Sequence, residues 1–248
     1  MTASKSALAP ASDRVRTEWL HRVEAEYRSA CIAQELTLWL MQAGASPDLL
    51  HEGLRIADDE LVHAELSMDA YLAAGGTNGP TLARETLGLT RRPGSILEED
   101  ITRAGVDMFC LGETVAVPLF KNLREGCTVP TARKALDRVL RDEVRHRDFG
   151  WALLEWNLST PHGPALKSLV ERELPGWFAR IRRCYAPAFA GALDTVSPDD
   201  RKWGLMAPAR YASVVERTYD RDWKRRFTRL DIDPDAAWKS AATGSPRA

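Results

Sequence analysis

Four long segments of the chain place apolar residues three and four positions apart, the spacing that gives an α-helix one buried face. Short runs rich in Gly, Ser, Pro and Thr separate them. The pattern predicts helices over residues 13–43, 47–74, 95–125 and 130–158. No segment alternates apolar and polar residues convincingly enough to indicate a strand. The sequence therefore predicts an all-α fold.

The connections between these helices differ in length. Gly44 stops the first helix, and Ser46 with Pro47 supplies the N-cap and first position of the second. Residues 126–130 form another short turn, whereas residues 75–94 form a long connection with turn residues at both ends. Two antiparallel hairpins joined by one long crossover are the connectivity of ferritin-like four-helix bundles. We expect that bundle over residues 13–160.

The rest of the chain is expected to form accessory segments. Residues 1–12 are rich in Ala, Ser and Pro and indicate a flexible N-terminal arm. Residues 161–232 contain two further helical patterns, at about 164–186 and 207–230, and predict a C-terminal helical extension that packs on the bundle. Residues 233–248 are expected to be a frayed tail.

Two segments of the bundle resemble each other. IADDELVHAEL and VLRDEVRHRDF each contain Asp-Glu-x-x-His between apolar positions. Residues three apart on a helix lie about 60° from each other in projection, so Glu60 and His63 face one point, as do Glu143 and His146. This Glu-x-x-His pair is the ligand motif of di-iron helical bundles.

Such a site also needs one carboxylate from each of the other two helices, and antiparallel geometry indicates where these should lie. Reflecting Glu143 through the turn near residue 128 gives Glu113. Reflecting Glu60 through the turn near residue 45 gives a position near 30, where Glu26 and Glu35 are both candidates. Spacing alone leaves the choice between these two open.

Burial favours a metal site over solvated helix faces. A single Glu-x-x-His is common on exposed helices, but here both copies and their partner carboxylates are surrounded by apolar residues. Several ionisable groups on inward faces are costly to bury without a counter-cation. Two correctly spaced copies therefore predict a buried di-metal centre.

The same segments carry a family resemblance. RVEAEYRSACIAQ, GASPDLL, DELVHAE, CLGETVA and DEVRHRDFGWALLEW resemble a group of small bacterial ferritin-like domain proteins, over roughly residues 15–158. The arrangement is more distantly similar to small subunits of ribonucleotide reductase and to di-iron monooxygenases. The resemblance implies that Glu26 is the carboxylate of the first helix.

The resemblance also implies a role for each residue. Glu26 and His63 would be terminal ligands of one metal, and Glu113 and His146 terminal ligands of the other. Glu60 and Glu143 would bridge the two metals. Asp59 would hold the second ring nitrogen of His146, and Asp142 that of His63. Two iron ions are expected, although manganese or a mixed manganese–iron pair also suits these ligands.

Composition excludes some other classes of protein. The 248 residues carry a formal net charge of -1, which argues against a broad affinity for nucleic acid or an acidic membrane, although a local basic patch is compatible with it. No apolar run is long enough to span a bilayer or to form a secretory signal, so a cytoplasmic location is the default expectation. The four cysteines form no CxxC pair, so an external electron donor is expected.

These features predict an oxygen-dependent di-iron oxidase or oxygenase that acts on a small organic substrate, as a monomer or homodimer. The extension, with its aromatic residues, would cover a substrate cavity beside the metals. The main alternative is an iron-handling ferroxidase or peroxide-detoxifying protein. A third interpretation, a module that uses metal only for folding, predicts metal binding without oxygen reactivity.

Overall fold

The computed structural model describes residues 11–186 and 195–243, and these residues are all helical apart from turns and connections. The four predicted helices are confirmed with boundaries shifted by no more than a few residues. The segment predicted as 95–125 is built from three consecutive pieces. The elements are α1 (Asp13–Gln42), α2 (Pro47–Ala73), α3 (Leu97–Ala104), η2 (Gly105–Glu113), α4 (Thr114–Glu125) and α5 (Pro130–Leu158).

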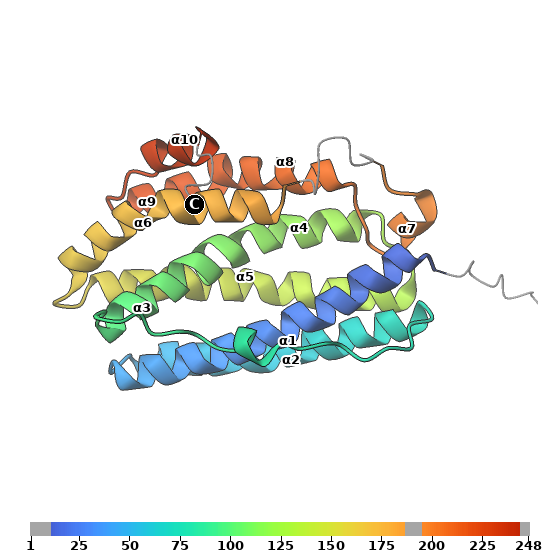
Figure 1. Ribbon diagram of the computed structural model, residues 1–248, viewed down its shortest axis with the longest axis horizontal. Helices are drawn as coiled ribbons and strands as arrows, with labels where there is room; N and C mark the ends of the chain where they lie inside the picture. The colour runs from blue at the N-terminus through green and yellow to red at the C-terminus, as the bar shows by residue number, and fades with distance from the viewer. Residues whose placement is uncertain (1–10, 187–194, 244–248) are drawn as a thin grey trace, which may run out of the picture.

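The helices lie in three layers. In Figure 1, α1 and α2 form the lower layer, the continuous α3–η2–α4 helix and α5 form the middle layer, and the C-terminal helices lie above them. Helix α2 packs against α1 on one side and α5 on the other, and α5 packs against η2 and α4. Gly44 makes the tight turn between α1 and α2 with a φ of 73°, a conformation that favours glycine.

The middle of the third predicted helix differs from expectation. Residues Gly105–Glu113 form a π-helix, with a wider turn than the α-helix that the sequence predicts. A Cβ at Gly150 of α5 would lie 2.5 Å from the Phe109 Cβ and 2.9 Å from the Cys110 nitrogen, so the two backbones meet closely there. The Trp223 Nε1 atom also donates to the Cys110 carbonyl over 3.1 Å. Tertiary contacts therefore support the π-helix, and they are not visible in the local pattern.

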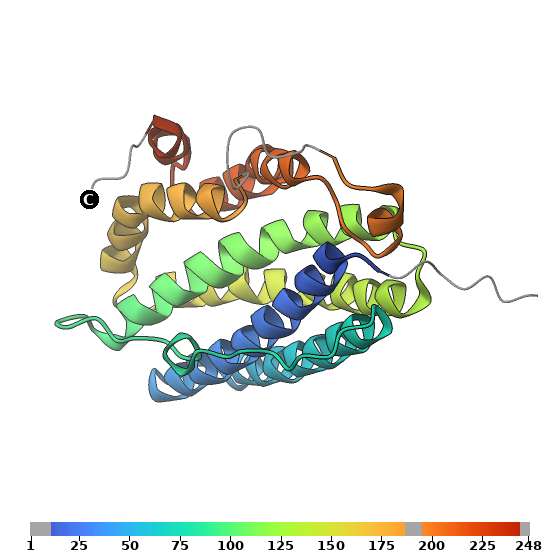
Figure 2. The ribbon, with the colours of Figure 1, turned by 45° about the vertical axis from the view of Figure 1, so that its right-hand side comes forward.

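The long connection between α2 and α3 is present as predicted, with one short 3₁₀ turn, η1 (Arg84–Thr86). It runs beside α1 and α2 (Figure 2). Glu24 and Glu35 of α1 hold it by accepting hydrogen bonds from the backbone nitrogens of Thr81 (2.8 Å) and Leu89 (2.6 Å).

The C-terminal extension forms the upper layer, which Figure 2 shows above α4 and α5. Helix α6 contacts α3 and α5, and α8 contacts α4. Phe178, Trp223 and Phe227 are fully buried there, and Phe227 packs edge-on against Trp151 of α5 with ring centroids 5.0 Å apart. The elements are α6 (Gly163–Cys184), α7 (Pro198–Lys202), α8 (Pro208–Thr218), η3 (Tyr219–Trp223), α9 (Lys224–Arg229) and α10 (Asp235–Thr243).

Near both ends of the chain, the structure differs from the expected arm and tail. Helix α10 occupies most of the segment that the sequence assigned to a tail, and its Ala237 is buried against α6. Of the expected N-terminal arm, Ser12 caps α1 and its hydroxyl donates to Asp200 over 2.7 Å. Residues 1–10 and 244–248 lie outside the described part of the chain. Within that part, the helices all fall short of the length and apolar character that crossing a membrane requires.

Candidate metal centre

The six predicted ligands come together between α1, α2, η2 and α5. Their side-chain donor atoms form two overlapping groups, and within each group the atoms lie within 4.8 Å of one another. Glu60 and Glu143 belong to both groups. The first group is Glu26, Glu60, His63 and Glu143, and the second is Glu60, Glu113, Glu143 and His146. All are buried except Glu113, which is partly buried.

Helical spacing and the packing of α2 on α5 together bring Glu60 to the middle of the cluster. On its own helix, its Oε2 lies 3.5 Å from the His63 Nδ1 atom, as the three-residue spacing requires. Across the interface, its Oε1 lies 3.2 Å from the His146 Nδ1 atom. One carboxylate thus faces both imidazoles.

The structure distinguishes the two carboxylates that spacing left open on the first helix. Glu26 is buried, and its Oε2 atom lies 3.8 Å from the His63 Nδ1 atom. Glu35 lies outside the cluster, where its carboxylate accepts the backbone hydrogen bond of Leu89. Glu26 is therefore the residue of α1 that joins the cluster.

Two buried aspartates orient the imidazoles. Asp142 Oδ2 lies 3.2 Å from the His63 Nε2 atom, and Asp59 Oδ2 lies 3.4 Å from the His146 Nε2 atom. This crosswise pairing is the one that the family resemblance implied. An aspartate that accepts a hydrogen bond from Nε2–H leaves the Nδ1 lone pair of the same neutral ring directed at the glutamates.

Sequence reasoning missed two arginines that hold these aspartates. Arg138 donates to Asp59 over 2.8 Å and also bonds Asp142, and Arg145 bonds Asp59. Burial opposes ionisation of both aspartates, but hydrogen bonds with the histidines and these guanidinium groups outweigh it and lower the pKa of each. The i,i+4 spacing of Arg138 and Asp142 was a visible signal of one contact. The contacts to Asp59 cross between helices and had no local signal.

The glutamates influence one another strongly. Burial raises the pKa of Glu26 and Glu143 well above the ordinary glutamate value, and repulsion from Glu60 and Glu113, respectively, adds to this effect. Burial also raises the pKa of Glu113. Glu60 differs, because the nearby imidazoles of His146 and His63 outweigh its burial and lower its pKa. Four clustered carboxylates are thus difficult to ionise together without added positive charge.

The donor set fits metal ions. Among the described residues, four buried side-chain atoms of the cluster have no hydrogen-bond partner: Glu60 Oε2, His63 Nδ1, Glu143 Oε2 and His146 Nδ1. Buried polar atoms without partners are rare, and these four come from residues of the two overlapping groups. Four ionised glutamates would balance the charge of two divalent cations. Oxygen and imidazole ligands suit iron and manganese.

The extension contributes a stacked aromatic pair, Tyr185 and Tyr211. Tyr185, which follows α6, is a partly buried residue whose ring stacks on Tyr211 of α8 with centroids 6.4 Å apart. Burial raises the pKa of the Tyr185 hydroxyl, and the negative charges of Glu113 and Glu143 raise it further. The charge of the cluster therefore affects ionisation of the Tyr185 hydroxyl. The sequence analysis did not select this residue.

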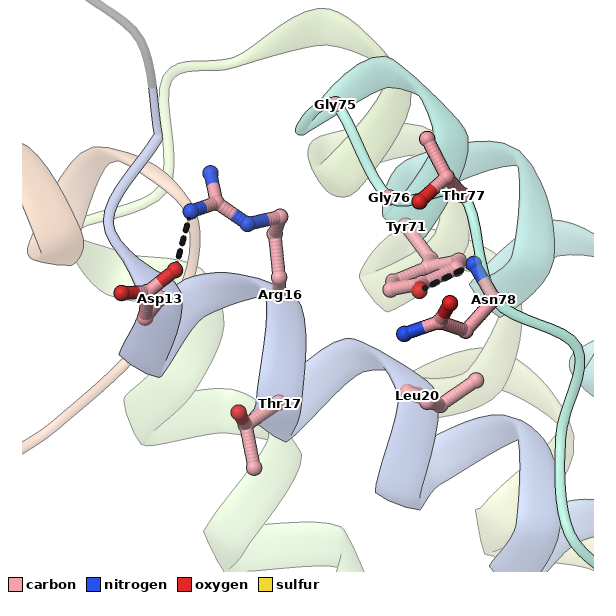
Figure 3. A pocket seen from close by; sticks show the side chains of 9 residues that line it. All are labelled: Asp13, Arg16, Thr17, Leu20, Tyr71, Gly75, Gly76, Thr77 and Asn78. Carbon is pink, nitrogen blue, oxygen red and sulfur yellow. Dashed lines mark hydrogen bonds and ion pairs between the residues drawn. The ribbon is translucent and has the colours of Figure 1, made fainter.

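The cavity in Figure 3 is separate from this cluster. It has a volume of about 280 Å³ between the start of α1 and the end of α2, and none of the ligand residues lines it. Its one arginine, Arg16, is occupied by Asp13 and by the carbonyls of Ala11 and Ala74. Tyr71 accepts a hydrogen bond from the Asn78 nitrogen over 3.0 Å. Of these contacts, the hydrogen bond from Arg16 to the Ala74 carbonyl links the start of α1 to the end of α2.

Comparisons with known proteins add no family assignment. No protein-family model matches the chain, and a search of curated proteins found no match. The interpretation of the cluster therefore depends on its geometry and on the sequence segments that carry the resemblance.

Proposed function

We propose that this chain is a non-haem di-iron oxidase or oxygenase of the ferritin-like superfamily, which activates dioxygen to oxidise a small organic substrate. The observation that carries the proposal is the pair of overlapping donor groups, each with one histidine, which share Glu60 and Glu143. A single-metal site would not need two such groups. Manganese or a manganese–iron pair would use the same donors.

The arrangement of helices supports the superfamily assignment. Helices α1 and α2 form one hairpin, α3–η2–α4 and α5 form another, and the connection over residues 74–96 joins them. Each helical segment contributes ligands to the interior between them, as in a ferritin-like four-helix bundle. We infer this fold from connectivity and from the placement of the ligands together.

The chain's own residues would perform three tasks. Glu26 and His63 would hold one ion, Glu113 and His146 the other, and Glu60 and Glu143 would lie between them. Asp59 and Asp142, kept ionised by Arg138 and Arg145, would retain the Nε2 protons so that each Nδ1 atom stays a ligand. When bound, a pair of ferrous ions supplies electrons to dioxygen, and a separate reductase would restore them.

The extension supports a substrate rather than a mineral store. It covers the α4 and α5 side of the two hairpins with a packed aromatic layer and carries the stacked pair Tyr185 and Tyr211. We expect the substrate to approach from this side. An iron-handling protein would use the same six ligands, but it would form a large assembly and take up many irons per chain.

Oxygen uptake by the full-length protein tests the proposal. The protein is loaded anaerobically with ferrous iron, mixed with oxygenated buffer, and followed with an oxygen electrode and by iron analysis. We expect two irons per chain, oxygen consumption faster than that of free ferrous iron, and continued consumption when a chemical reductant is added. Uptake of many irons in a large particle would favour iron handling, and two bound irons without oxygen consumption would overturn the enzymatic proposal.

A further inference from the structure

A second chemically distinctive place is the groove between α4 and α8, which we call the basic groove. It has a volume of about 490 Å³ and is lined by α4, α8, η3 and one residue of α5. None of its lining residues is a ligand or aspartate of the metal centre. Helices α4 and α8 lie side by side in Figures 1 and 2 and are in contact. Five cationic side chains line it: Lys121, Arg147, Arg210, Arg217 and Arg221.

The charge of the basic groove is unbalanced. Only two carboxylates, Glu125 and Asp222, line it beside the five cations, which leaves an excess of three positive charges (5 − 2). Arg147 pairs with Asp148 over 2.9 Å, and within the described part of the chain the other four cations make no ion pair. Arg210 donates to the Asn122 Oδ1 atom over 3.0 Å, and Arg217 donates to the Ser213 hydroxyl over 3.2 Å. Both contacts are to neutral groups and leave the guanidinium charge uncompensated.

Arginines in other parts of the extension interface are paired instead. Arg103 contacts Glu173 of α6 at 3.1 Å, and Arg182 of α6 contacts Glu216 of α8 at 2.9 Å. Where arginines connect helices elsewhere in the extension, acidic residues therefore pair with them. The small number of acidic residues in the basic groove is specific to that region.

The arginines of α8 and η3 line up along one side of the groove. Arg210, Val214, Arg217 and Arg221 follow one another at intervals of three and four residues, so they share one face of the continuous α8–η3 helix. Val214 is buried and Arg210 is half-buried, whereas Arg217 and Arg221 are exposed. Like charges that share a cavity repel one another. A bound anion would remove this repulsion.

We propose that the basic groove binds a small polyanion that carries two or more phosphate or carboxylate groups. Guanidinium groups bind both chemistries through paired, charge-assisted hydrogen bonds. The cavity volume is in the range of small-molecule sites. Val117, Pro118 and Val214 supply an apolar surface for the carbon skeleton of such a ligand. The site does not depend on the metal centre, and the two proposals can fail separately.

Titration calorimetry on the full-length protein at low salt tests the proposal. The probes are a hexose bisphosphate and tricarballylate, with the unphosphorylated hexose as the neutral control. We expect at least one polyanion to bind once per chain, with an affinity that falls as sodium chloride is raised, and the hexose not to bind. Preference between the two probes identifies phosphate or carboxylate as the natural group.

Three variants locate the site. Arg210→Gln and Arg217→Gln should each weaken polyanion binding roughly ten-fold, since each removes a charge-assisted contact. Arg225→Gln is the matched control, because Arg225 is exposed on α9 and does not line the groove. It should change the affinity less than about two-fold. Thermal melts without ligand establish that the variants are folded. Failure of both polyanions to bind, or equal weakening by all three substitutions, would overturn the proposal.

Discussion

The two helical hairpins supply equivalent candidate ligands from unequal surroundings. Glu26 and the Glu60–His63 pair lie on the regular α-helices α1 and α2, whose outer side is covered by the long connection. Glu113 ends a π-helix, and the Glu143–His146 pair lies on α5, beneath the extension. The repeated motif thus defines the ligands, whereas the second hairpin carries the features that make the site asymmetric.

The two hairpins also differ in the arginines that hold the two aspartates. Arg138 and Arg145, which hold both Asp59 and Asp142, come from α5 alone. When the two motifs are aligned, α2 has Arg55 in place of Arg138 and Val62 in place of Arg145. Arg55 is exposed. One hairpin therefore supplies the arginines that hold the aspartates of both, and changes in α5 should affect binding of both metals.

The largest expected effect on metal binding comes from removing one of the shared carboxylates. Glu60→Ala and Glu143→Ala should each abolish binding of both metals, because each residue belongs to both donor groups. Glu26→Ala and Glu113→Ala should each lose one metal. Metal content after anaerobic loading with ferrous iron, measured by mass spectrometry, distinguishes two, one and none per chain.

Glu35→Ala is the matched control for these variants. It removes a glutamate of α1 that holds the long connection and lies outside the cluster, so two metals should remain. Retention of both metals by Glu26→Ala, with loss of one by Glu35→Ala, would contradict the assignment on α1.

Acidification should release the metals at a higher pH than ordinary glutamates would allow. Burial and mutual repulsion raise the pKa of Glu26 and Glu143. Burial lowers the pKa of His146, but the nearby carboxylates Asp59 and Glu60 have a larger opposite effect and raise it to about 10. A metal must displace these protons, so its affinity falls as the pH falls through the raised values. Manganese titrations should show affinity already declining above the ordinary glutamate pKa of about 4.3. Constant affinity down to that pH would contradict the expected proton competition.

The arginines of α5 should affect the affinity for both metals although they bind neither. Arg145→Gln should weaken metal binding about 10- to 100-fold, the usual effect of losing a group that orients a ligand. Competitive titration with a chelator measures this for both ions. Arg55→Gln, at the exposed equivalent of Arg138 on α2, should leave the affinity unchanged. An equal effect of the two substitutions would show that general charge, rather than orientation of the aspartates, is responsible.

Most of the helices and the core of the cluster could be predicted because they depend on helix geometry alone. Spacing places Glu60 with His63 and Glu143 with His146, and reflection through a short turn finds Glu113. Glu26 needed the family resemblance, because the register of α1 on α2 is not fixed by the turn. The structure resolves the choice by placing Glu35 on the long connection.

The features that escaped prediction depend on tertiary contacts. An α-helix and a π-helix share much of their apolar pattern, and the contacts of Trp223 and Gly150 with residues 109 and 110 appear only when the chain is folded. Helix α10 is short and buries few side chains, so its pattern is weak. Arg145 meets Asp59 across two helices, and no local spacing encodes that contact.

The smallest expected effect is on the free energy of unfolding, when one glycine in each hairpin is replaced. A Cβ at Gly150 would meet the backbone of η2, whereas a Cβ at Gly53 of α2 would meet a side-chain atom, the Thr37 hydroxyl, at 2.3 Å. Gly150→Ala should lower the free energy of unfolding by about 1–3 kcal/mol through overpacking. Gly53→Ala should lower it less, because only the Thr37 side chain, whose hydroxyl donates to the Ala33 carbonyl, must rearrange, and the helix propensity gain of about 1 kcal/mol offsets part of that cost. Urea denaturation measures both, and a larger loss at Gly53 would contradict the comparison.

The central claim is that two metals share Glu60 and Glu143. Anomalous diffraction from crystals of the iron-loaded protein, collected at the iron absorption edge, tests it most directly. We predict two peaks on either side of these carboxylates, one beside Glu26 and His63 Nδ1 and the other beside Glu113 and His146 Nδ1. A single peak, or iron bound away from this cluster, would contradict the account.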